Sequence, residues 1–483
     1  MLFNSWGYLL FLALGVGLHW LLPHRFRIHL LAILSICFYA MWRWDFCLLM
    51  VFSAWVDYVA SSRIAAAENK RTRKHWLWAS LIVNLGLLVF FKYTYFLYAN
   101  LQAMGGWFGV GMPDLALGIL LPLGISFYTF QTISYTIDVY RKVQTPAQSF
   151  PAFLTYVTFW PQLIAGPVLR AGEVLPQLIS ERKFQRSDFF YGLERILWGL
   201  FKKVVLADQI AGFVDKAFSA PAQGFTGFDV WVATFLFGFQ IYFDFAGYSD
   251  VAIGSARMMG IRFPENFNWP YMALSPKDLW QRWHISLSSW IRDYLYLPLT
   301  GQRYQTKSLG GIAVAAESGR NRRIGALFLT WFIMGLWHGA GWTFALWGIY
   351  HAIFITLFRS VKVLRLLPTR RPAIAWVLML PISMASWIFF RAESLEQALL
   401  LYGKLLDPRA YDLGNRLMSG DSYLLAVALV LGMLGIFFIK RLIEKDKWGW
   451  WPLAFGRGLA AATAVFLILV YLRPIRQFIY FQF

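Results

Sequence analysis

The stretch Trp331–Trp347 reads WFIMGLWHGAGWTFALW and places one ionisable residue, His338, among aromatic and aliphatic neighbours. Ionisable groups at membrane depth are costly, and where they occur they face a bundle interior or a water-filled cavity. Imidazole is also the side chain whose ordinary pKa best suits proton transfer near neutral pH. The stretch therefore predicts a buried proton-handling group inside a membrane protein.

The composition of the whole chain agrees with a membrane protein. Of its 483 residues, 58% are hydrophobic, 19% are aromatic and only 14% are charged, whereas soluble domains carry about 25% charged residues. The net charge of +20 is distributed among apolar runs, which favours basic loops and contact with anionic lipids over nucleic-acid binding. Cys37 and Cys47 offer neither a metal motif nor a disulfide framework.

Apolar runs recur along the chain and predict an all-α polytopic membrane protein, with about eleven transmembrane helices plus re-entrant or interfacial helices. Residues 1–483 are expected to form a single transmembrane domain. Basic charge in Arg63–Lys74, Arg303–Arg323 and Arg359–Arg371 predicts that these segments are cytoplasmic. The clearest runs are Leu9–Leu22, Leu30–Met41, Cys47–Ala60, Trp76–Tyr98, Leu115–Ile133, Val230–Val251, Ala326–Trp347, Ile374–Phe390, Tyr423–Ile439 and Leu459–Leu472.

A long polar stretch, Gly260–Gly301, interrupts this pattern. Ser275 is expected to cap a helix whose first residue is Pro276. The following apolar residues recur every three or four positions, which predicts an amphipathic helix at the interface or inside a funnel. A helix that lies on the surface without chemistry fits the same periodicity. The apolar positions are Trp280, Trp283, Leu287, Ile291 and Tyr294.

Two further histidines are weighed against His338. His284 lies in the polar stretch, where a lone histidine is more often a packing residue, but its pairing with His338 in a chain of seven histidines favours a role in chemistry. His351 follows His338 by 13 residues, and on one continuous helix it would face a different side. We therefore rank His351 below the other two.

The run at residues 240–250, QIYFDFAGYSD, carries polar groups inside an apolar helix. Gln240, Asp244 and Tyr248 share one helix face, and Asp250 follows on another side. Carboxylates in such a place need a partner or water. They form either a structural ion pair with an arginine or the polar wall of a substrate cavity.

Several motifs are absent from the chain, and their absence narrows the chemistry. There is no phosphate-binding loop, dinucleotide fingerprint, HExxH motif or GxSxG elbow. The two histidines lack a clear third ligand, so no metal site is predicted. The residues alone leave histidine-assisted transfer in a buried cavity or proton-coupled transport, and the lack of an internal repeat weakens transport.

Three long motifs carry a resemblance to a known family. They are QIYFDFAGYSDVAIGSARMMGIRFPENFNWPY (Gln240–Tyr271), LWQRWHISLSSWIRDYLYLPL (Leu279–Leu299) and GLWHGAGWTFALWG (Gly335–Gly348). The chain resembles the membrane-bound O-acyltransferase (MBOAT) superfamily, and most closely its bacterial alginate O-acetyltransferase, AlgI-like, branch. FWPQLIAGPVLR (Phe159–Arg170) and the terminal FIYFQF fit the same group. The resemblance spans nearly the whole chain, with a motif core at about residues 235–350.

The resemblance implies a fold of many helices around a central tunnel, with His338 as general base. His284 would orient the acceptor or stabilise developing charge. Arg282 and Arg292 would help to offset the phosphates of the donor. The residues taken as candidates for the substrate tunnel are Gln240, Asp244, Tyr248, Asp250, Trp337, Arg282 and Arg292.

The activity implied by the resemblance is transfer of an acetyl group from a cytoplasmic thioester, in the simplest case acetyl-CoA. The chain would lie in the bacterial inner membrane and serve O-acetylation of an extracytoplasmic polysaccharide, with alginate favoured. No tightly bound cofactor is expected. A separate extracytoplasmic acyltransferase or acyl-carrier protein, of SGNH type and similar to AlgJ or AlgX, would take the group on to the polymer.

Other functions remain open at this stage. Within the superfamily they are O-acetylation of peptidoglycan or cellulose, D-alanyl transfer to teichoic acid, and acyl transfer to a lipid or sterol. Outside it they are a proton-coupled transporter and a structural subunit of an export complex. Each differs from the favoured function in what becomes esterified, or in whether an ester forms at all.

Overall fold

The computed structural model describes residues 3–164, 166–305, 312–314, 319–445, 450–472 and 478–479. Within these ranges helices dominate, and two short strands form an antiparallel hairpin in which Tyr304 pairs with Ala313. The elements in chain order are α1 (Trp6–Leu21), α2 (His24–Ala40), α3 (Asp45–Ala66), α4 (Lys70–Leu88), η1 (Val89–Tyr93), α5 (Thr94–Trp107), α6 (Ile125–Tyr140), α7 (Phe150–Thr158), α8 (Trp160–Leu163), α9 (Ala171–Ile179), α10 (Arg186–Leu200), η2 (Phe201–Ala207), α11 (Asp208–Phe218), η3 (Ala222–Gly224), α12 (Gly227–Met258), η4 (Pro270–Met272), α13 (Pro276–Trp280), α14 (Ile285–Ile291), η5 (Arg292–Tyr296), α15 (Leu297–Leu299), β1 (Arg303–Gln305), β2 (Ile312–Val314), α16 (Arg320–His338), α17 (Trp342–Ser360), α18 (Lys362–Arg370), α19 (Pro372–Arg391), α20 (Leu395–Leu406), η6 (Pro408–Ala410), α21 (Gly420–Lys445) and α22 (Trp450–Tyr471).

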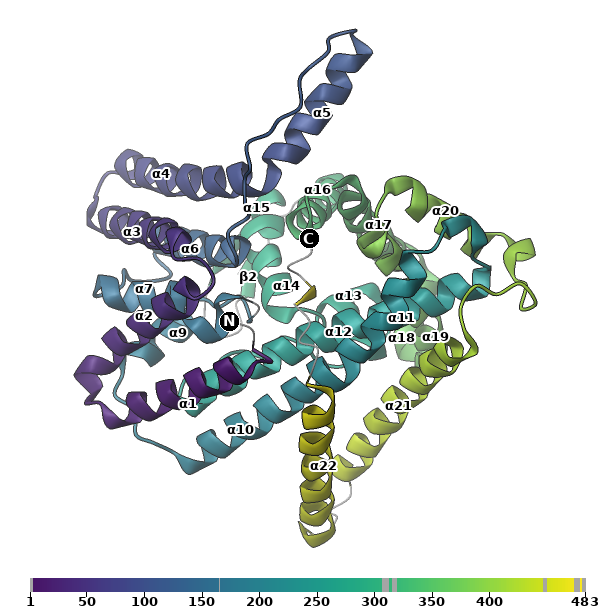
Figure 1. Cartoon of the computed structure of the whole chain (residues 1–483). Helices are drawn as coiled ribbons and strands as arrows, with labels where there is room; N and C mark the ends of the chain where they lie inside the picture. Colours follow the sequence, from purple (N-terminus) through teal and green to yellow (C-terminus); the bar gives the residue numbers. More distant parts are fainter. Residues whose placement is uncertain are drawn as a thin grey trace.

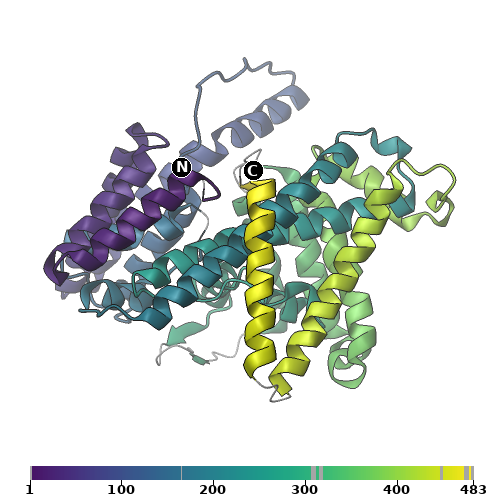
Figure 2. The same ribbon diagram turned by 60° about the horizontal axis from the view of Figure 1, so that its bottom comes forward.

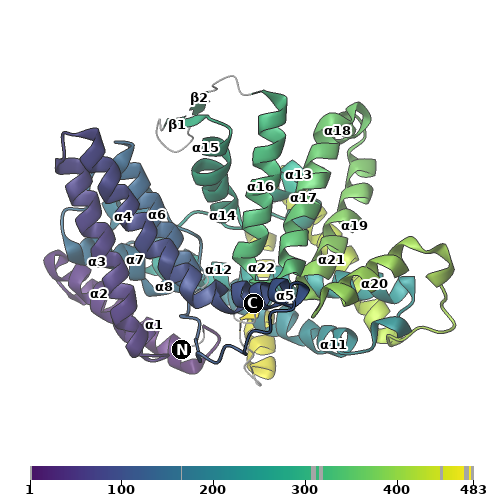
Figure 3. The same ribbon diagram turned by 90° about the horizontal axis from the view of Figure 1, so that it is seen from above.

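The helices form two groups, and the long helix α12 runs between them. Helices α1–α4, α6 and α7 gather on one side, and α16, α17, α19 and α20 gather on the other (Figures 1 and 3). With 32 residues, α12 is about 48 Å long, well above the thickness of a bilayer core. It packs against α10, η2, α11 and α19, and its Ser255 hydroxyl lies 2.8 Å from the Tyr8 hydroxyl of α1, so it contacts both groups.

Glycine lets α12 approach its neighbours closely. A Cβ atom added to Gly199 would lie 2.7 Å from the carbonyl oxygen of Gly247, and one added to Gly192 would lie 2.6 Å from that of Gly254. In a membrane, such contacts between small residues let two backbones pack directly. The glycines of α10 and α12 therefore set the distance between these two helices.

The C-terminal part of the chain leaves the body and then returns to it. Helices α21 and α22 extend away from the other elements (Figure 1), and they converge at their far ends (Figure 2). Phe478 and Ile479 then lie buried in the interior. The backbone N–H of Ile479 donates a hydrogen bond of 2.7 Å to Asp244 Oδ2, which fixes this segment against α12.

Within the described residues, five helices are long and apolar enough to cross a membrane. The pair α17 and α18, bent by 82°, makes a sixth if it counts as one span. The prediction of an all-α polytopic membrane protein is confirmed, whereas the number of about eleven spans is not. The five spans are Asp45–Ala66, Lys70–Trp107, Gly227–Met258, Pro372–Arg391 and Gly420–Leu442.

One apolar run that suggested a helix is only partly helical. Residues 110–122, which include the first part of the run Leu115–Ile133, have no regular secondary structure. Helix α6 begins only at Ile125. Pro122 lacks a backbone N–H, and Gly124 adopts a left-handed conformation with φ of 75°. These two residues start the helix later than the hydropathy indicates.

The amphipathic helix expected after Ser275 is also broken, although its beginning is confirmed. The Ser275 hydroxyl accepts a 3.2 Å hydrogen bond from the N–H of Asp278, and Pro276 is the first helical residue. The helix then stops at Trp280, and a new helix starts only at Ile285. The apolar positions are buried in the core, so this segment belongs inside the bundle and not on its surface.

Candidate active site

His338 lies at the apex of a helical hairpin made by α16 and α17. The two helices run antiparallel, because Gly348 packs against the backbone of Trp331 and Gly335 against that of Phe344. The apolar run Ala326–Trp347 is therefore not one continuous helix: α16 ends at His338 and α17 starts at Trp342. The intervening glycines adopt extended conformations, which turns the chain directly after the histidine.

The His338 ring lies in an aromatic enclosure. It is 4% exposed, and its centroid lies 4.9 Å from those of Trp337 and Trp347 and 5.3 Å from that of Phe390. Aromatic rings from three helices thus surround one titratable group. A low-dielectric enclosure of this kind favours the uncharged imidazole, which is the form that can accept a proton.

His284 lies in a strained turn between α13 and α14. Its backbone is left-handed, with φ of 42° and ψ of 56°, and its side chain is fully buried. Its Nδ1 atom lies 3.0 Å from Asn266 Oδ1, an acceptor that also receives the Ser286 hydroxyl at 2.9 Å. A carbonyl acceptor at this position favours the tautomer that carries hydrogen on Nδ1. In the described part of the chain, Nε2 has no hydrogen-bond partner, so its lone pair remains available.

The two histidines belong to one buried aromatic cluster. The Phe127 ring centroid lies 5.8 Å from that of Trp337 and 6.4 Å from that of His284. The Trp337 ring in turn lies 4.9 Å from the His338 ring, so a chain of ring contacts connects the two histidines. The structure therefore brings together the two residues that the sequence analysis put forward for catalysis, and their roles stay predictions.

His351 lies beside the same cluster. The sequence analysis ranked it below the other two histidines because a continuous helix would have turned it to a different side. Its ring packs edge-on against Trp347 at 4.8 Å and Trp280 at 4.9 Å. It lines a small cavity of about 10 Å³ together with Trp283, Ser386 and other residues, space for about one water molecule. Among the described residues, no hydrogen-bond partner reaches the buried ring nitrogens of His284 (Nε2), His351 (Nε2), Trp280, Trp337, Trp347 and Trp387.

The two candidate carboxylates of α12 form ion pairs. Asp244 pairs with Lys203 at 2.6 Å, and Asp250 pairs with Lys202 at 2.5 Å and with Arg195 at 2.7 Å. Both carboxylates are therefore neutralised, mainly by lysines of η2 where an arginine was expected. A role for these residues as a tunnel wall stays a prediction.

The two other polar candidates of α12 each have a polar atom without a hydrogen-bond partner among the described residues. Gln240 Oε1 and the Tyr248 hydroxyl are buried and lack a hydrogen-bond partner within the described ranges. The Tyr248 ring packs against Phe478 at 4.4 Å and Phe3 at 5.4 Å. Residues from both ends of the described chain thus meet at this helix face.

The two arginines assigned to the donor lie in ion pairs. Arg282 contacts Asp278 at 2.7 Å, and Arg292 contacts Asp293 at 2.6 Å. Arg170 also binds Asp293, at 2.5 Å. The Arg292 side chain is 57% exposed, so it can reach a ligand from the solvent side more easily than Arg282 can.

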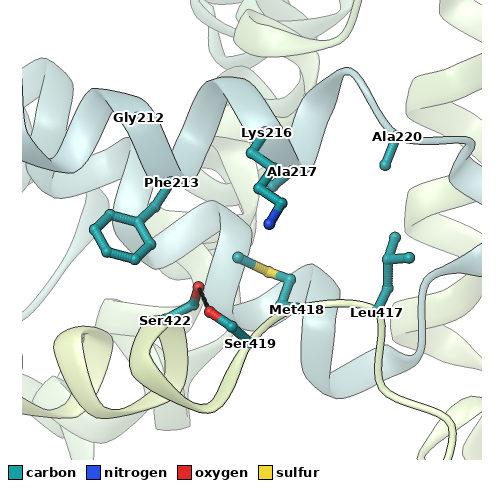
Figure 4. A pocket seen from close by; sticks show the side chains of 9 residues that line it. All are labelled: Gly212, Phe213, Lys216, Ala217, Ala220, Leu417, Met418, Ser419 and Ser422. Atoms are coloured by element: carbon teal, nitrogen blue, oxygen red, sulfur yellow. Dashed lines mark hydrogen bonds between the residues drawn. The ribbon is translucent and has the colours of Figure 1, made fainter.

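A cavity of about 280 Å³ lies apart from the histidine cluster. It lies between α11 and the segment that leads into α21, with the Lys216 amino group directed into it and the Ser419 and Ser422 hydroxyls joined at 3.0 Å (Figure 4). Its lining residues are Gly212, Phe213, Lys216, Ala217, Ala220, Leu417, Met418, Ser419 and Ser422. The lining contains none of the candidate residues, so this cavity is not part of the candidate active site.

Two residues of the site escaped the sequence analysis. Asn266 binds the ring of His284, and Lys92 binds backbone carbonyl groups at the end of α16. Lys92 had a signal, because it is a lone ionisable residue within the apolar run Trp76–Tyr98. Asn266 had none, because a single asparagine in a polar stretch is unremarkable.

The fold and site so far define a helical membrane protein with a buried pair of histidines, and comparison with known proteins gives the family. The model of the membrane-bound O-acyltransferase family matches residues 143–391. This range includes α12, Arg170 and both histidines, whereas Phe127 and Lys92 precede it. The chain belongs to the membrane-bound O-acyltransferase family, and it is an acyltransferase.

Similar proteins cover most of the chain. It is 41% identical to a protein of Azotobacter vinelandii described as a probable alginate O-acetylase, over 93% of this chain and 87% of that protein. A protein of Pseudomonas aeruginosa with the same description is 39% identical, over 91% and 81%. The peptidoglycan O-acetyltransferase of Helicobacter pylori is 36% identical, over 76% and 72%.

Proposed function

We propose that this acyltransferase moves an acetyl group from a cytoplasmic thioester, acetyl-CoA in the simplest case, for O-acetylation of an extracytoplasmic polysaccharide. An alginate-like exopolysaccharide is the favoured polymer, because the relatives described as probable alginate O-acetylases match nearly the whole chain. The observation that carries the chemistry is the common aromatic enclosure of His338 and His284, in which His284 Nε2 has no described partner.

His338 would act as the general base. The oxygen of an acceptor hydroxyl forms a bond to the acetyl carbonyl carbon while its proton passes to the neutral imidazole. The carbon–sulfur bond then breaks, and the leaving thiolate takes a proton back from the imidazolium. Proton transfer of this kind contributes about 10²–10⁴-fold, so positioning and polar stabilisation must supply most of the acceleration.

His284 would orient the acceptor. Its Nδ1–H is held by Asn266, so Nε2 presents a lone pair that can accept a hydrogen bond from another O–H or N–H group of the acceptor, while the proton of the attacking hydroxyl goes to His338. The burial of both rings excludes water, which would otherwise compete with the acceptor for the acetyl group. Arg282 and Arg292 would offset the phosphates of the donor only in part, since each already has a carboxylate partner.

The setting of the reaction is part of the proposal. The chain would lie in the bacterial inner membrane with its basic segments in the cytoplasm, and the donor would enter from that side. A separate extracytoplasmic acyltransferase or acyl-carrier protein would receive the acetyl group and deliver it to the polymer. No tightly bound cofactor would be needed, because the thioester supplies both the acyl group and the leaving group.

Peptidoglycan is the second candidate for the polymer. It is favoured by the similarity to the Helicobacter pylori peptidoglycan O-acetyltransferase, which covers 76% of this chain. The chemistry at His338 would be the same, and only the final acceptor would differ.

The experiment compares the ester-linked acetate of isolated polysaccharides and peptidoglycan in three strains. They are a strain that lacks the gene, the same strain with the wild-type gene, and the same strain with His338→Ala at equal membrane level. We expect one polymer to lose acetate in the first strain and to regain it only with the wild type. Unchanged acetate in every polymer would refute the acceptor class, and full recovery with His338→Ala would refute the general base.

A further inference from the structure

The end of helix α16 is a buried helix terminus whose carbonyl groups need partners. The last four carbonyl groups of a helix have no partner within it, and burial of such groups without hydrogen bonds is costly. Gly335 O accepts the N–H of Gly339 at 3.5 Å. The carbonyl groups of Leu336, Trp337 and His338 remain to be satisfied by another part of the chain.

Two consecutive residues of η1 satisfy all three of these carbonyl groups. The Tyr93 hydroxyl donates to Leu336 O at 2.9 Å. The Lys92 ammonium donates to Trp337 O at 2.5 Å and to His338 O at 3.1 Å. The contacts join segments about 245 residues apart in sequence, so they tie the N-terminal group of helices to the helix that carries His338.

Lys92 also matches the electrostatics of this place. The C-terminal end of a helix carries a partial negative charge, which favours a cation. The Lys92 ammonium lies 5.8 Å over the Trp337 ring, a cation–π arrangement. Its hydrogen bonds in the described part of the chain go to backbone carbonyl groups, which is one way in which an intramembrane lysine is compensated.

The backbone conformation around Lys92 also indicates a functional role for this segment. Lys92 and Tyr93 lie in a π-helical turn within the otherwise continuous helix Lys70–Trp107. Such turns cost stability and are frequent at functional sites. Both adjacent donors of this turn, Lys92 and Tyr93, reach the same end of α16.

We propose that Lys92, assisted by Tyr93, is a positioning residue for His338: it holds the carbonyl end of α16 and thereby fixes the imidazole against the reacting groups. This inference rests on the proposed function, because acyl transfer by His338 is its readout. Lys92 is not assigned contact with the substrate. A misplacement of about 1 Å at a catalytic group can cost about 10²-fold in rate, which sets the size of the expected effect.

The test measures transfer from labelled acetyl-CoA in isolated membranes, at equal protein level, for Lys92→Met, Lys92→Arg and Tyr93→Phe. Lys92→Met is expected to lower kcat by about 10²-fold with the KM for acetyl-CoA unchanged within about twofold. Lys92→Arg keeps charge and donors and is expected to recover at least about a tenth of the activity. Exposed Lys70 on the same helix provides the matched control, and Lys70→Met is expected to behave as wild type.

Each outcome decides one of the two proposals. A Lys92→Met protein within about threefold of wild-type kcat overturns the positioning role, and so does a raised KM with unchanged kcat, which would indicate contact with the donor. If Lys92→Met does not accumulate in the membrane, Tyr93→Phe decides, with a fall in kcat of about threefold to tenfold expected and wild-type kcat contradicting the proposal. A fully active His338→Ala protein instead refutes the general-base role in the proposed function, whatever the Lys92 variants do.

Discussion

At the scale of single residues, the two histidines are held by different means. His338 is fixed through the backbone of a helix end, whereas His284 is fixed through its own ring and a left-handed backbone. A non-glycine residue in this conformation costs about 1–3 kcal/mol and persists only where its surroundings determine it. The backbone carbonyl oxygen of Asn266 accepts a hydrogen bond of 2.9 Å from the N–H of Ile285, and its side-chain oxygen binds the ring of His284. Asn266 therefore holds both the backbone and the ring of this turn.

Asn266→Ala should therefore reduce transfer without removing either histidine. The buried Nδ1–H of His284 loses its acceptor, which costs about 1–3 kcal/mol, and the ring is free to rotate. We expect kcat to fall by about 10-fold to 100-fold, measured as acetyl transfer in membranes that contain equal amounts of protein. Exposed Asn268 on the same segment gives the control, Asn268→Ala, and equal activity of the two variants would contradict the role given to Asn266.

The sequence allowed prediction of those site residues whose type is rare in their surroundings. A histidine in an apolar run stands out in composition, so His338 could be selected from the sequence, whereas His284 lies in a polar stretch and was selected because it pairs with His338. Asp244 and Asp250 were expected to need partners, but the choice of Lys203 and Lys202 depends on how α12 packs against η2. Partner residues follow from tertiary contacts, which a single sequence does not display.

At the scale of elements, the hairpin of α16 and α17 depends on glycine. A Cβ atom at Gly348 would overlap the backbone of Trp331, and one at Gly335 would overlap that of Phe344. A side chain at either position would push apart the two helices that frame His338. Hydropathy did not reveal this hairpin, because its turn at Gly339–Gly341 lies within one uninterrupted apolar run.

Gly348→Ala should separate the two helices and lower acyl transfer by at least about tenfold. Overpacking of a close contact costs about 1–3 kcal/mol, although alanine by itself favours a helix more than glycine does. Gly325 of the neighbouring helix α16 provides the control, because a Cβ atom there meets nothing within 4 Å. Thermal unfolding and transfer are measured for both variants in detergent or membranes, and a Gly348→Ala protein as stable and active as Gly325→Ala would contradict the packing argument.

The presence of helices could be predicted from the sequence, but their first and last residues could be predicted less well. Apolar composition identifies segments that avoid water, and most of the predicted runs contain a helix. Pro122 and Gly124 delay the start of α6, and the left-handed His284 divides the polar stretch. These boundaries depend on backbone conformation and on contacts far along the chain, which the periodicity of side chains does not encode.

At the scale of the whole molecule, basic segments gather at one end. The turn between α3 and α4, the strands β1 and β2, the start of α16 and helix α18 all lie at the same end, and α5, α11 and α20 lie toward the opposite end (Figure 3). The basic segments expected in the cytoplasm fall at the first end. This arrangement fits the rule that short cytoplasmic loops carry the excess of lysine and arginine.

The orientation can be tested by labelling single cysteines with a membrane-impermeant maleimide in a chain whose Cys37 and Cys47 are replaced by serine. Lys70 and Lys362 are exposed at the basic end, and Asp412 is exposed in the segment after α20. We expect the Asp412→Cys protein to react in cells whose outer membrane alone is permeabilised, because its end faces away from the cytoplasm. Lys70→Cys and Lys362→Cys should react at least about tenfold less until the inner membrane is opened, since the basic ends of membrane helices are retained on the inside. Reaction of Lys362→Cys before opening, with Asp412→Cys protected, would reverse the orientation, and the donor would then have to enter from the side opposite to the basic segments.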